Sequence, residues 1–181
     1  KYTKMYGESL ARTVEDDIWA ELDGFNTTRA LTADNRVQAA DLENVLNDLY
    51  SNDIDPDDCS MVVNNEILSD MLNPADGIAQ YFVRADAVGG TGVTLRTGSM
   101  GMIYGMNVFY GSSISSSTST DAIVGAVYRE DACVFAAQQD VRVQAQYDVE
   151  YLGTKVVADM IYGVKLIDES GHVLGLNLKN P

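Results

Sequence analysis

One stretch in the last third of the chain decides how the sequence is interpreted, and it reads Val141-Arg142-Val143-Gln144-Ala145-Gln146-Tyr147-Asp148. Apolar and polar residues alternate along it without a break. Successive side chains of a β-strand point to opposite faces of the sheet. The alternation therefore predicts a strand with one buried face and one face in water, as in antiparallel sheets.

The rest of the second half also predicts mostly β-structure. Its expected strands are short apolar segments bounded by turn residues: 81–83, 93–95, 102–110 (interrupted by Gly105), 122–127, 132–137, 162–167 and 173–178. Ser and Thr residues fill 112–120, which we expect to be a polar loop. For 151–160 we expect a short helix or helical turn. A turn at 168–171 should join the last two strands.

The first half of the chain predicts helices instead. Apolar side chains recur every four residues near its start, at Tyr2, Tyr6, Leu10, Val14, Ile18 and Leu22. This spacing predicts one long helix that stops near Gly24. A second helix is expected to begin at Thr32, which can cap it, and to end before the turn at 51–58, where Pro56 blocks continuation.

A short buried strand is expected next, at Met61-Val62-Val63. Asn64 can cap a third helix over 66–72, and Pro74 follows the end of that helix. Helices and strands therefore occupy different parts of the chain, which is the pattern of an α+β fold.

The charge is as unevenly placed as the secondary structure. The 181 residues carry 27 acidic and 12 basic side chains, for a net charge of −15. Residues 1–76 hold 17 of the acidic and five of the basic residues, and the remainder is near balance. A chain that wraps nucleic acid or docks on anionic lipid needs basic patches, so both functions are excluded. With 46% apolar residues, the chain is not a disordered acidic tail.

The two cysteines, Cys59 and Cys133, lie in apolar runs and are interpreted as small buried side chains. They form no disulfide framework and no zinc-type spacing. No apolar run approaches the roughly 20 residues of a membrane span, and we expect no signal peptide. The chain starts at Lys1 rather than at Met, so we expect a preceding segment to have been removed or left out.

No catalytic, cofactor or metal site is expected. Asp53, Asp55 and Asp57 sit at calcium-loop spacing, but Asp58 stands where such a loop needs Gly, and Asn64 stands where it needs Glu. A solvated acidic turn is the better interpretation. The glycines between 89 and 101 lack the spacing of a phosphate-binding loop and fit hairpin turns. His172, the only histidine, falls in an expected turn with no nucleophile motif near it in sequence.

The order of elements resembles the carboxyl-terminal two-thirds of a tailed-virus major capsid protein with the HK97 fold. Four stretches carry the resemblance. They are the spine-like helix 1–24, the helix–turn–strand–helix unit 31–73, the strand region 100–113, and the run 122–167. The last is the most specific, with Ala-Ile-Val-Gly-Ala-Val at 122–127, the alternating strand, and Tyr-Leu-Gly-Thr-Lys-Val-Val-Ala-Asp-Met-Ile-Tyr-Gly-Val-Lys-Leu at 151–166.

The resemblance implies an architecture and a function. Residues 1–26 and 139–167 would form the peripheral (P) domain, with the spine helix and long strands. Residues 27–138 and 168–181 would form the axial (A) domain, a mixed sheet with flanking helices. The resemblance begins at the spine helix, so we expect the N-terminal arm and extended (E) loop of the family to be absent from this chain. Some relatives crosslink through a Lys of that loop and an Asn near the C-terminus. Asn177 and Asn180 are present here, but no motif assigns them that role and no crosslink is expected.

The implied function is self-assembly into pentamers and hexamers of an icosahedral shell that encloses double-stranded DNA without sequence-specific binding. The shell would form in the host cytoplasm and would meet portal, scaffolding and decoration proteins. Basic residues are scarce, so we expect six of them to form ion pairs between subunits: Arg84, Arg96, Arg129, Arg142, Lys155 and Lys165. Two alternatives stay open, an encapsulin-type nanocompartment and a stand-alone acidic α+β hydrolase or ligand-binding domain.

Overall fold

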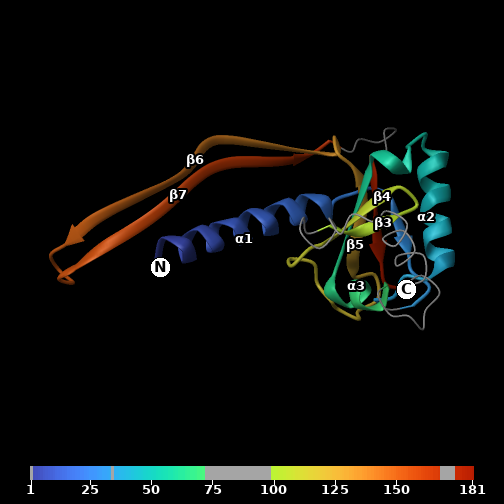
Figure 1. Cartoon of the computed structure of the whole chain (residues 1–181), viewed down its shortest axis with the longest axis horizontal. Helices are drawn as coiled ribbons and strands as arrows, with labels where there is room; N and C mark the ends of the chain where they lie inside the picture. The colour runs from blue at the N-terminus through green and yellow to red at the C-terminus, as the bar shows by residue number, and fades with distance from the viewer. Residues whose placement is uncertain (1, 34, 72–98, 168–173) are drawn as a thin grey trace.

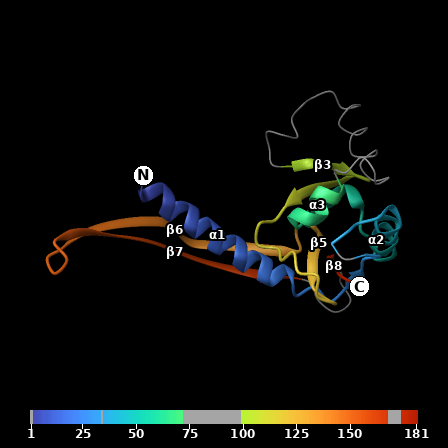
Figure 2. The same cartoon turned by 90° about the horizontal axis from the view of Figure 1, so that it is seen from below.

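The structure is a computed structural model that describes residues 2–33, 35–71, 99–167 and 174–181. It has a compact part, built on a mixed sheet, and a long extension, in which a helix runs beside a two-stranded ribbon (Figure 1). Figure 2 shows from a second direction that the helix and the ribbon leave the compact part on the same side. We call the compact part the body. Within the described ranges, no helix is long and apolar enough to cross a lipid bilayer.

The long first helix is confirmed as α1, Tyr2–Leu22. Its apolar stripe ends in the body, where Ile18, Trp19 and Leu22 pack in a cluster with Phe25. The amide of Gly24 donates a hydrogen bond of 3.0 Å to the Glu21 carbonyl and closes the end of the helix, as its sequence position predicts. The outer turns of α1 extend away from the body (Figure 2).

The predicted start of the second helix was wrong. Helix α2 covers Ala39–Ser51 and begins seven residues after Thr32. The Thr32 hydroxyl caps no helix, because it donates instead to the Asp41 carboxylate at 2.6 Å. Asp41, 2% exposed, also accepts the amide of Gln38 at 3.0 Å, which satisfies a free donor at the start of α2. Tertiary contacts thus move the helix start along the chain.

The third helix is confirmed as α3, Asn65–Met71, with its cap. The Oδ1 atom of Asn64 accepts the Ile67 amide at 2.8 Å, which is the geometry of an N-cap. A short 3₁₀ helix, Pro56–Asp58, occupies the acidic turn before it. Asp55 caps this turn by accepting the Asp57 amide at 3.2 Å. One of the three carboxylates at calcium-loop spacing therefore binds a backbone amide of its own turn.

The body contains a six-stranded mixed sheet with the strand order β1-β8-β5-β2-β4-β3. The strands, in chain order, are β1 (Thr28–Ala30), β2 (Cys59–Val63), β3 (Ser99–Ile103), β4 (Met106–Tyr110), β5 (Ile123–Arg129) and β8 (Gly175–Lys179). The pairs β1–β8 and β2–β4 are parallel, and the other neighbours are antiparallel. The expected mixed sheet with flanking helices is therefore confirmed.

One predicted strand proved to be two. The segment 102–110 is a hairpin in which β3 pairs with β4, so Gly105 ends a strand and does not merely interrupt one. Tyr104 (φ 51°) and Gly105 (φ 91°) both adopt positive φ, as in the tight turns that favour hairpins. A side chain at Gly105 would meet the Asp57 carboxylate, so this turn requires glycine.

The core lies between the sheet and the helices α2 and α3. Its fully buried members come from every layer and include Leu42 and Leu49 of α2, Met61 and Val63 of β2, Ile67 of α3, Val108 of β4 and Leu178 of β8. The buried strand at 61–63 is confirmed, with Met61 and Val63 completely buried and Val62 half-buried between them. Cys59 is buried as predicted, whereas Cys133 is only half-buried.

The extension contains the two longest strands. β6 covers Cys133–Asp148 and β7 covers Gly153–Leu166, and they pair antiparallel as a separate two-stranded ribbon. The helix expected over 151–160 was wrong, because residues 153–160 belong to β7. Apolar residues at 156, 157, 160 and 161 fit helical spacing as well as strand spacing, and pairing with β6 decides between the two.

Several sequence predictions lie outside the described residues. They are the strands at 81–83 and 93–95, the turn at 168–171, Pro74, His172, Arg84 and Arg96. The loop expected at 112–120 is confirmed, since residues 111–122 contain neither helix nor strand.

Candidate assembly surface

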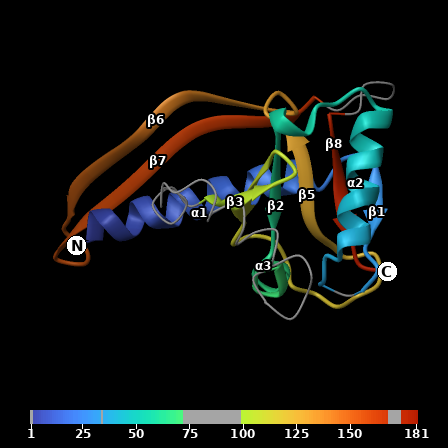
Figure 3. The same ribbon diagram turned by 45° about the vertical axis from the view of Figure 1, so that its right-hand side comes forward.

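The β6–β7 ribbon has an inner and an outer half, separated by two irregularities in its register. In the inner half Cys133–Ala137 pairs with Tyr162–Leu166, and in the outer half Arg142–Asp148 pairs with Gly153–Asp159. Between the halves, β6 contains two residues more than β7, which marks β-bulges. Bulges bend and twist a strand, and Figure 3 shows that the ribbon bends along its length.

The inner half is attached to α1 by polar contacts. The Tyr162 hydroxyl donates to Asp17 at 2.5 Å, and this contact raises the pKa of the tyrosine. The amide of Leu166 donates to Glu21 at 3.3 Å, and the Lys165 ammonium lies 3.7 Å from the same carboxylate. The Leu166 side chain joins the apolar cluster around Leu22. This face of β7 is therefore covered by α1.

The outer half presents an apolar face that nothing in the described chain buries. Cross-strand partners share a face, so Val143, Ala145 and Tyr147 lie beside Ala158, Val156 and Thr154. Val143 is 47% exposed and Tyr147 is 60% exposed. Residues 154, 156 and 158 follow the same alternation as Tyr162, so this outer apolar face continues the face that α1 covers in the inner half.

The expectation that this strand has a buried face was therefore wrong for the isolated chain. The alternation is present, and Arg142, Gln144 and Gln146 form the polar face opposite. The apolar face is open because α1 covers only the inner half. An uncovered apolar face with a charged reverse side is typical of a surface that binds another protein.

The hairpin that joins the two strands adds to this surface. Its apolar side chains are the most exposed large ones in the described residues, with Val149 at 73%, Tyr151 at 80% and Leu152 at 78%. Leu152 also has a positive φ of 49°. We define the outer apolar face and this hairpin together as the candidate assembly surface.

Three of the six predicted ion-pair residues have acidic partners within the same chain. Arg129 binds Asp131, and this hydrogen-bonded contact lowers the pKa of the carboxylate. Arg142 lies 2.7 Å from Asp159 across the ribbon and lowers its pKa in the same way. The third is Lys165, which lies near Glu21.

Lys155 lies opposite Gln146 in the ribbon register, and no acidic group of the described chain is within ion-pair distance of it. Roles of these residues between subunits stay predictions.

A second set of polar contacts holds α1 to the body, and no sequence pattern predicts these contacts. Glu15 accepts the amide of Ser112 at 2.8 Å and its hydroxyl at 2.9 Å, and Asp16 accepts the Ser113 hydroxyl at 2.5 Å. These carboxylates lie off the apolar stripe of α1 and look like ordinary solvated residues in sequence. Their role depends on the loop after β4, 97 residues away.

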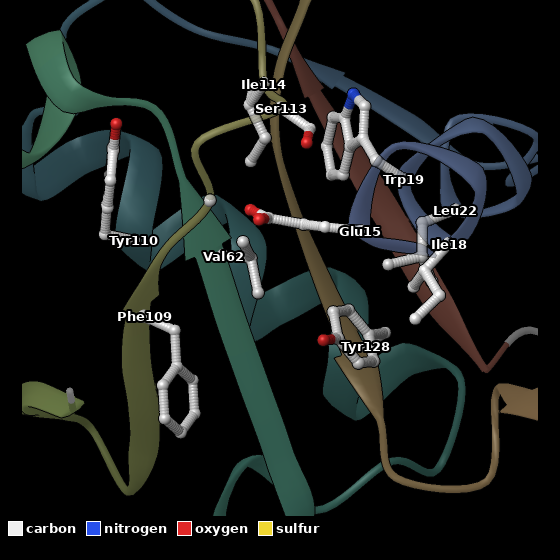
Figure 4. Close-up of a pocket in the computed structure, with 11 residues that line it drawn as sticks. Glu15, Ile18, Trp19, Leu22, Val62, Phe109, Tyr110, Ser113, Ile114 and Tyr128 are labelled. Carbon is white, nitrogen blue, oxygen red and sulfur yellow. The ribbon is translucent and has the colours of Figure 1, made fainter. Parts of the chain in front are cut away.

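A cavity of about 320 Å³ lies beneath these contacts, between α1 and the sheet. Figure 4 shows Ile18, Trp19 and Leu22 entering it from α1, and Val62, Phe109 and Tyr128 entering it from the strands. Its walls are almost entirely apolar, and Glu15 is the one charged residue that lines it.

The hydrolase alternative finds little support in the described residues. No group of three or more His, Cys, Asp or Glu side chains there is arranged to hold a metal ion. Burial raises the pKa of the Cys59 thiol to about 11, which keeps it protonated and a poor nucleophile. Asn177 and Asn180 are fully buried, and Asn180 donates to the Ser117 carbonyl at 2.7 Å.

Comparison with known proteins identifies the fold. No protein-family model matches the sequence, and no curated protein matches it significantly. Among solved structures, one from Mycobacterium phage Che8 matches 98% of this chain with a TM-score of 0.71 and 17% identity. The mature capsid of bacteriophage PhiM1 matches 97% with a TM-score of 0.65 and 14% identity. The chain has the HK97-like capsid fold.

The capsid fold extends beyond these two phages. A virus-like particle from Pyrococcus furiosus matches 95% of this chain, with a TM-score of 0.56 and 12% identity. The chain spans 61% of the Che8 protein, 63% of the PhiM1 protein and 64% of the Pyrococcus protein. The likeness therefore covers nearly all of this chain and about three-fifths of each capsid-fold protein.

Proposed function

We propose that the protein is a structural subunit of a virion shell, in which copies assemble into pentamers and hexamers around double-stranded DNA. The observation that carries the proposal is the candidate assembly surface on a chain with the capsid fold. An exposed apolar ribbon favours aggregation of a monomeric protein, whereas in a shell a neighbouring copy covers it. Many such contacts in a closed symmetric object hold each subunit firmly even when each contact is weak.

The charge of the chain suits a container for DNA. A wall with a net charge of −15 per copy repels phosphate, so packaged DNA does not adhere to it. The same charge makes copies repel one another. The outer apolar face is free of charged side chains, which favours it as the place where copies meet.

Within this proposal α1 and most of the ribbon form the P domain, 1–26 and 139–167. The sheet body and residues 133–138 at the start of β6 belong to the A domain, 27–138 and 168–181. The separation of ribbon and body into two sheets supports the division. Portal, scaffolding and decoration proteins would be the partners of the assembled shell, and its assembly would take place in the host cytoplasm. No catalytic step, cofactor or metal enters this function.

A nanocompartment shell is the second candidate. Its support is the fold similarity to the virus-like particle from Pyrococcus furiosus, which has a lower TM-score than the similarity to the Che8 phage structure. The two candidates share the subunit contacts and differ in what the shell encloses. Nucleic acid extracted from purified particles would support the virion, whereas a co-purified enzyme without DNA would support the nanocompartment.

Electron microscopy and analytical ultracentrifugation of the full-length protein that carries this chain test the proposal. We expect closed shells, or rings of five and six copies, over a wide range of protein concentration. A protein that stays monomeric at all concentrations and salt conditions would contradict it.

A further inference from the structure

The cavity between α1 and the sheet has the size and walls of a small-molecule site. An apolar cavity of about 150 Å³ holds one benzene ring, so about 320 Å³ leaves room for a ring and a short chain. Trp19, Phe109 and Tyr128 supply aromatic surfaces, and Ile18 and Ile114 supply aliphatic ones. Ligand sites typically combine such walls with a few polar groups that fix orientation.

Two polar groups are directed to this space. Figure 4 shows the Glu15 carboxylate reaching from α1 toward Val62 and the Tyr128 hydroxyl turned to the same side. The amide and hydroxyl of Ser112 already donate to Glu15 through three contacts, and a carboxylate can accept about four hydrogen bonds. Tyr128 makes a stacked contact with Phe25, and its hydroxyl has no hydrogen-bond partner among the described residues.

Glu15 is the one charged side chain that lines the cavity, and its charge is not neutralised within the described chain. Glu15, Asp16 and Asp17 are consecutive carboxylates, and none of them forms an ion pair with a described Lys or Arg. Glu15 is only part-exposed, so a cation beside it would be screened less than on an open surface. A positive group therefore complements this end of the cavity, and a negative group is repelled.

We propose that this cavity binds a small organic cation, with an aromatic or branched apolar body among Trp19, Phe109 and Tyr128 and an ammonium group on Glu15. The site does not depend on the shell function. Because its walls come from both α1 and the sheet, a bound cation links the two and strengthens the attachment of α1 to the body.

Trp19 gives a direct measurement, because it is the only tryptophan in the chain and it lines the cavity. Tryptophan fluorescence of the intact protein is titrated with phenethylammonium, with neutral 2-phenylethanol and with anionic 3-phenylpropionate. We expect saturable changes with the ammonium probe, at an affinity about tenfold above that of the alcohol, with the carboxylate weakest. Equal affinities, or no saturable change with the ammonium probe, would overturn the proposal.

Two variants separate charge from shape. Glu15→Gln keeps an oxygen that can accept from Ser112 and removes the charge. The affinity for the ammonium probe should therefore fall to that for the alcohol. Val62→Phe fills the cavity and should abolish saturable binding of all three probes. Its matched control is Val157→Phe on the exposed ribbon, which should bind like the unmodified protein. Undiminished ammonium binding in Glu15→Gln, a variant with an intact cavity, contradicts the proposal even if Val62→Phe does not fold.

Discussion

Strand β2 in the body and the outer half of β6 in the ribbon each direct apolar side chains to one face of a sheet, but only one of these faces is buried. Met61 and Val63 are fully buried between the sheet and its helices, whereas Val143 and Tyr147 are 47% and 60% exposed. A continuous apolar run predicts the strand in β2 and alternation predicts it in β6, but neither pattern says which molecule covers the apolar face. In β2 the same chain covers it, and in β6 we infer that another copy does.

The largest predicted difference in the free energy of unfolding is between a leucine substitution in the body and one in the ribbon hairpin. Leu178→Ala removes a fully buried side chain from the body core and should lower the free energy of unfolding by about 2–5 kcal/mol. Leu152→Ala, at the 78% exposed hairpin, should change it by less than about 0.5 kcal/mol. Urea denaturation of both variants measures the difference. Similar losses would mean that the hairpin is buried within the free chain.

The next largest difference in stability is expected between alanine substitutions at Gly175 in the body and Gly163 in the ribbon. A side chain at Gly175 would approach the Phe25 ring to 2.6 Å and the Val127 carbonyl oxygen to 2.8 Å, so Gly175→Ala should cost about 1–3 kcal/mol. Gly163, in the ribbon, has no atom within 4 Å of the same position. Gly163→Ala should be neutral or slightly stabilising, since alanine restricts the unfolded chain. Thermal unfolding compares the two, and a neutral Gly175→Ala would show that β8 does not pack on Phe25.

The buried thiol of the body predicts a pH dependence. Burial raises the pKa of Cys59 from its ordinary value of 9.0 to about 11. The folded chain thus holds the thiol proton more tightly than the unfolded chain, so this contribution to stability is full below pH 9.0 and falls as pH rises toward about 11.

The difference between the unmodified protein and Cys59→Ala isolates this effect from other groups that titrate. We expect unfolding free energy to fall more steeply with pH in the unmodified protein. Parallel pH curves for the two proteins would show that Cys59 is not desolvated.

The smallest effect on stability is expected from breaking the ion pair of the ribbon. Arg142 and Asp159 are bonded across its polar face, but both are solvent-accessible, and surface pairs contribute little to stability. Arg142→Gln should therefore leave the urea midpoint within error of the unmodified protein. A clear loss of stability would indicate that this pair fixes the bulged segment of β6 in the free chain.

Local signals explain what the sequence could predict. The four-residue stripe of α1 and the cap at Asn64 depend on neighbours in sequence, and both are confirmed. The predicted start of α2 and the helix predicted over 151–160 were wrong, because distant partners decide both segments. Thr32 bonds Asp41, and residues 153–160 pair with β6. Local spacing contains no information on such partners.

The candidate assembly surface was predictable only in part. Its alternating strand was identified, but its exposure depends on how far α1 follows the ribbon. No sequence pattern predicts the hydrogen bonds of Glu15 and Asp16 to Ser112 and Ser113 in the loop after β4, because each pair is 97 positions apart. The resemblance carried by four stretches, of which 122–167 is the most specific, predicted the fold through the order of its elements.

One variant tests most directly whether the outer face of the ribbon joins copies of the protein. Val143→Asp places a charge on the outer apolar face, and Gln144→Asp places the same charge on the polar face as a matched control. Analytical ultracentrifugation and electron microscopy of the full-length protein compare their assembly, and denaturation compares their folding. We expect both variants to fold with an unchanged midpoint, and only Val143→Asp to remain as free subunits. Shells formed equally well by Val143→Asp would contradict the account.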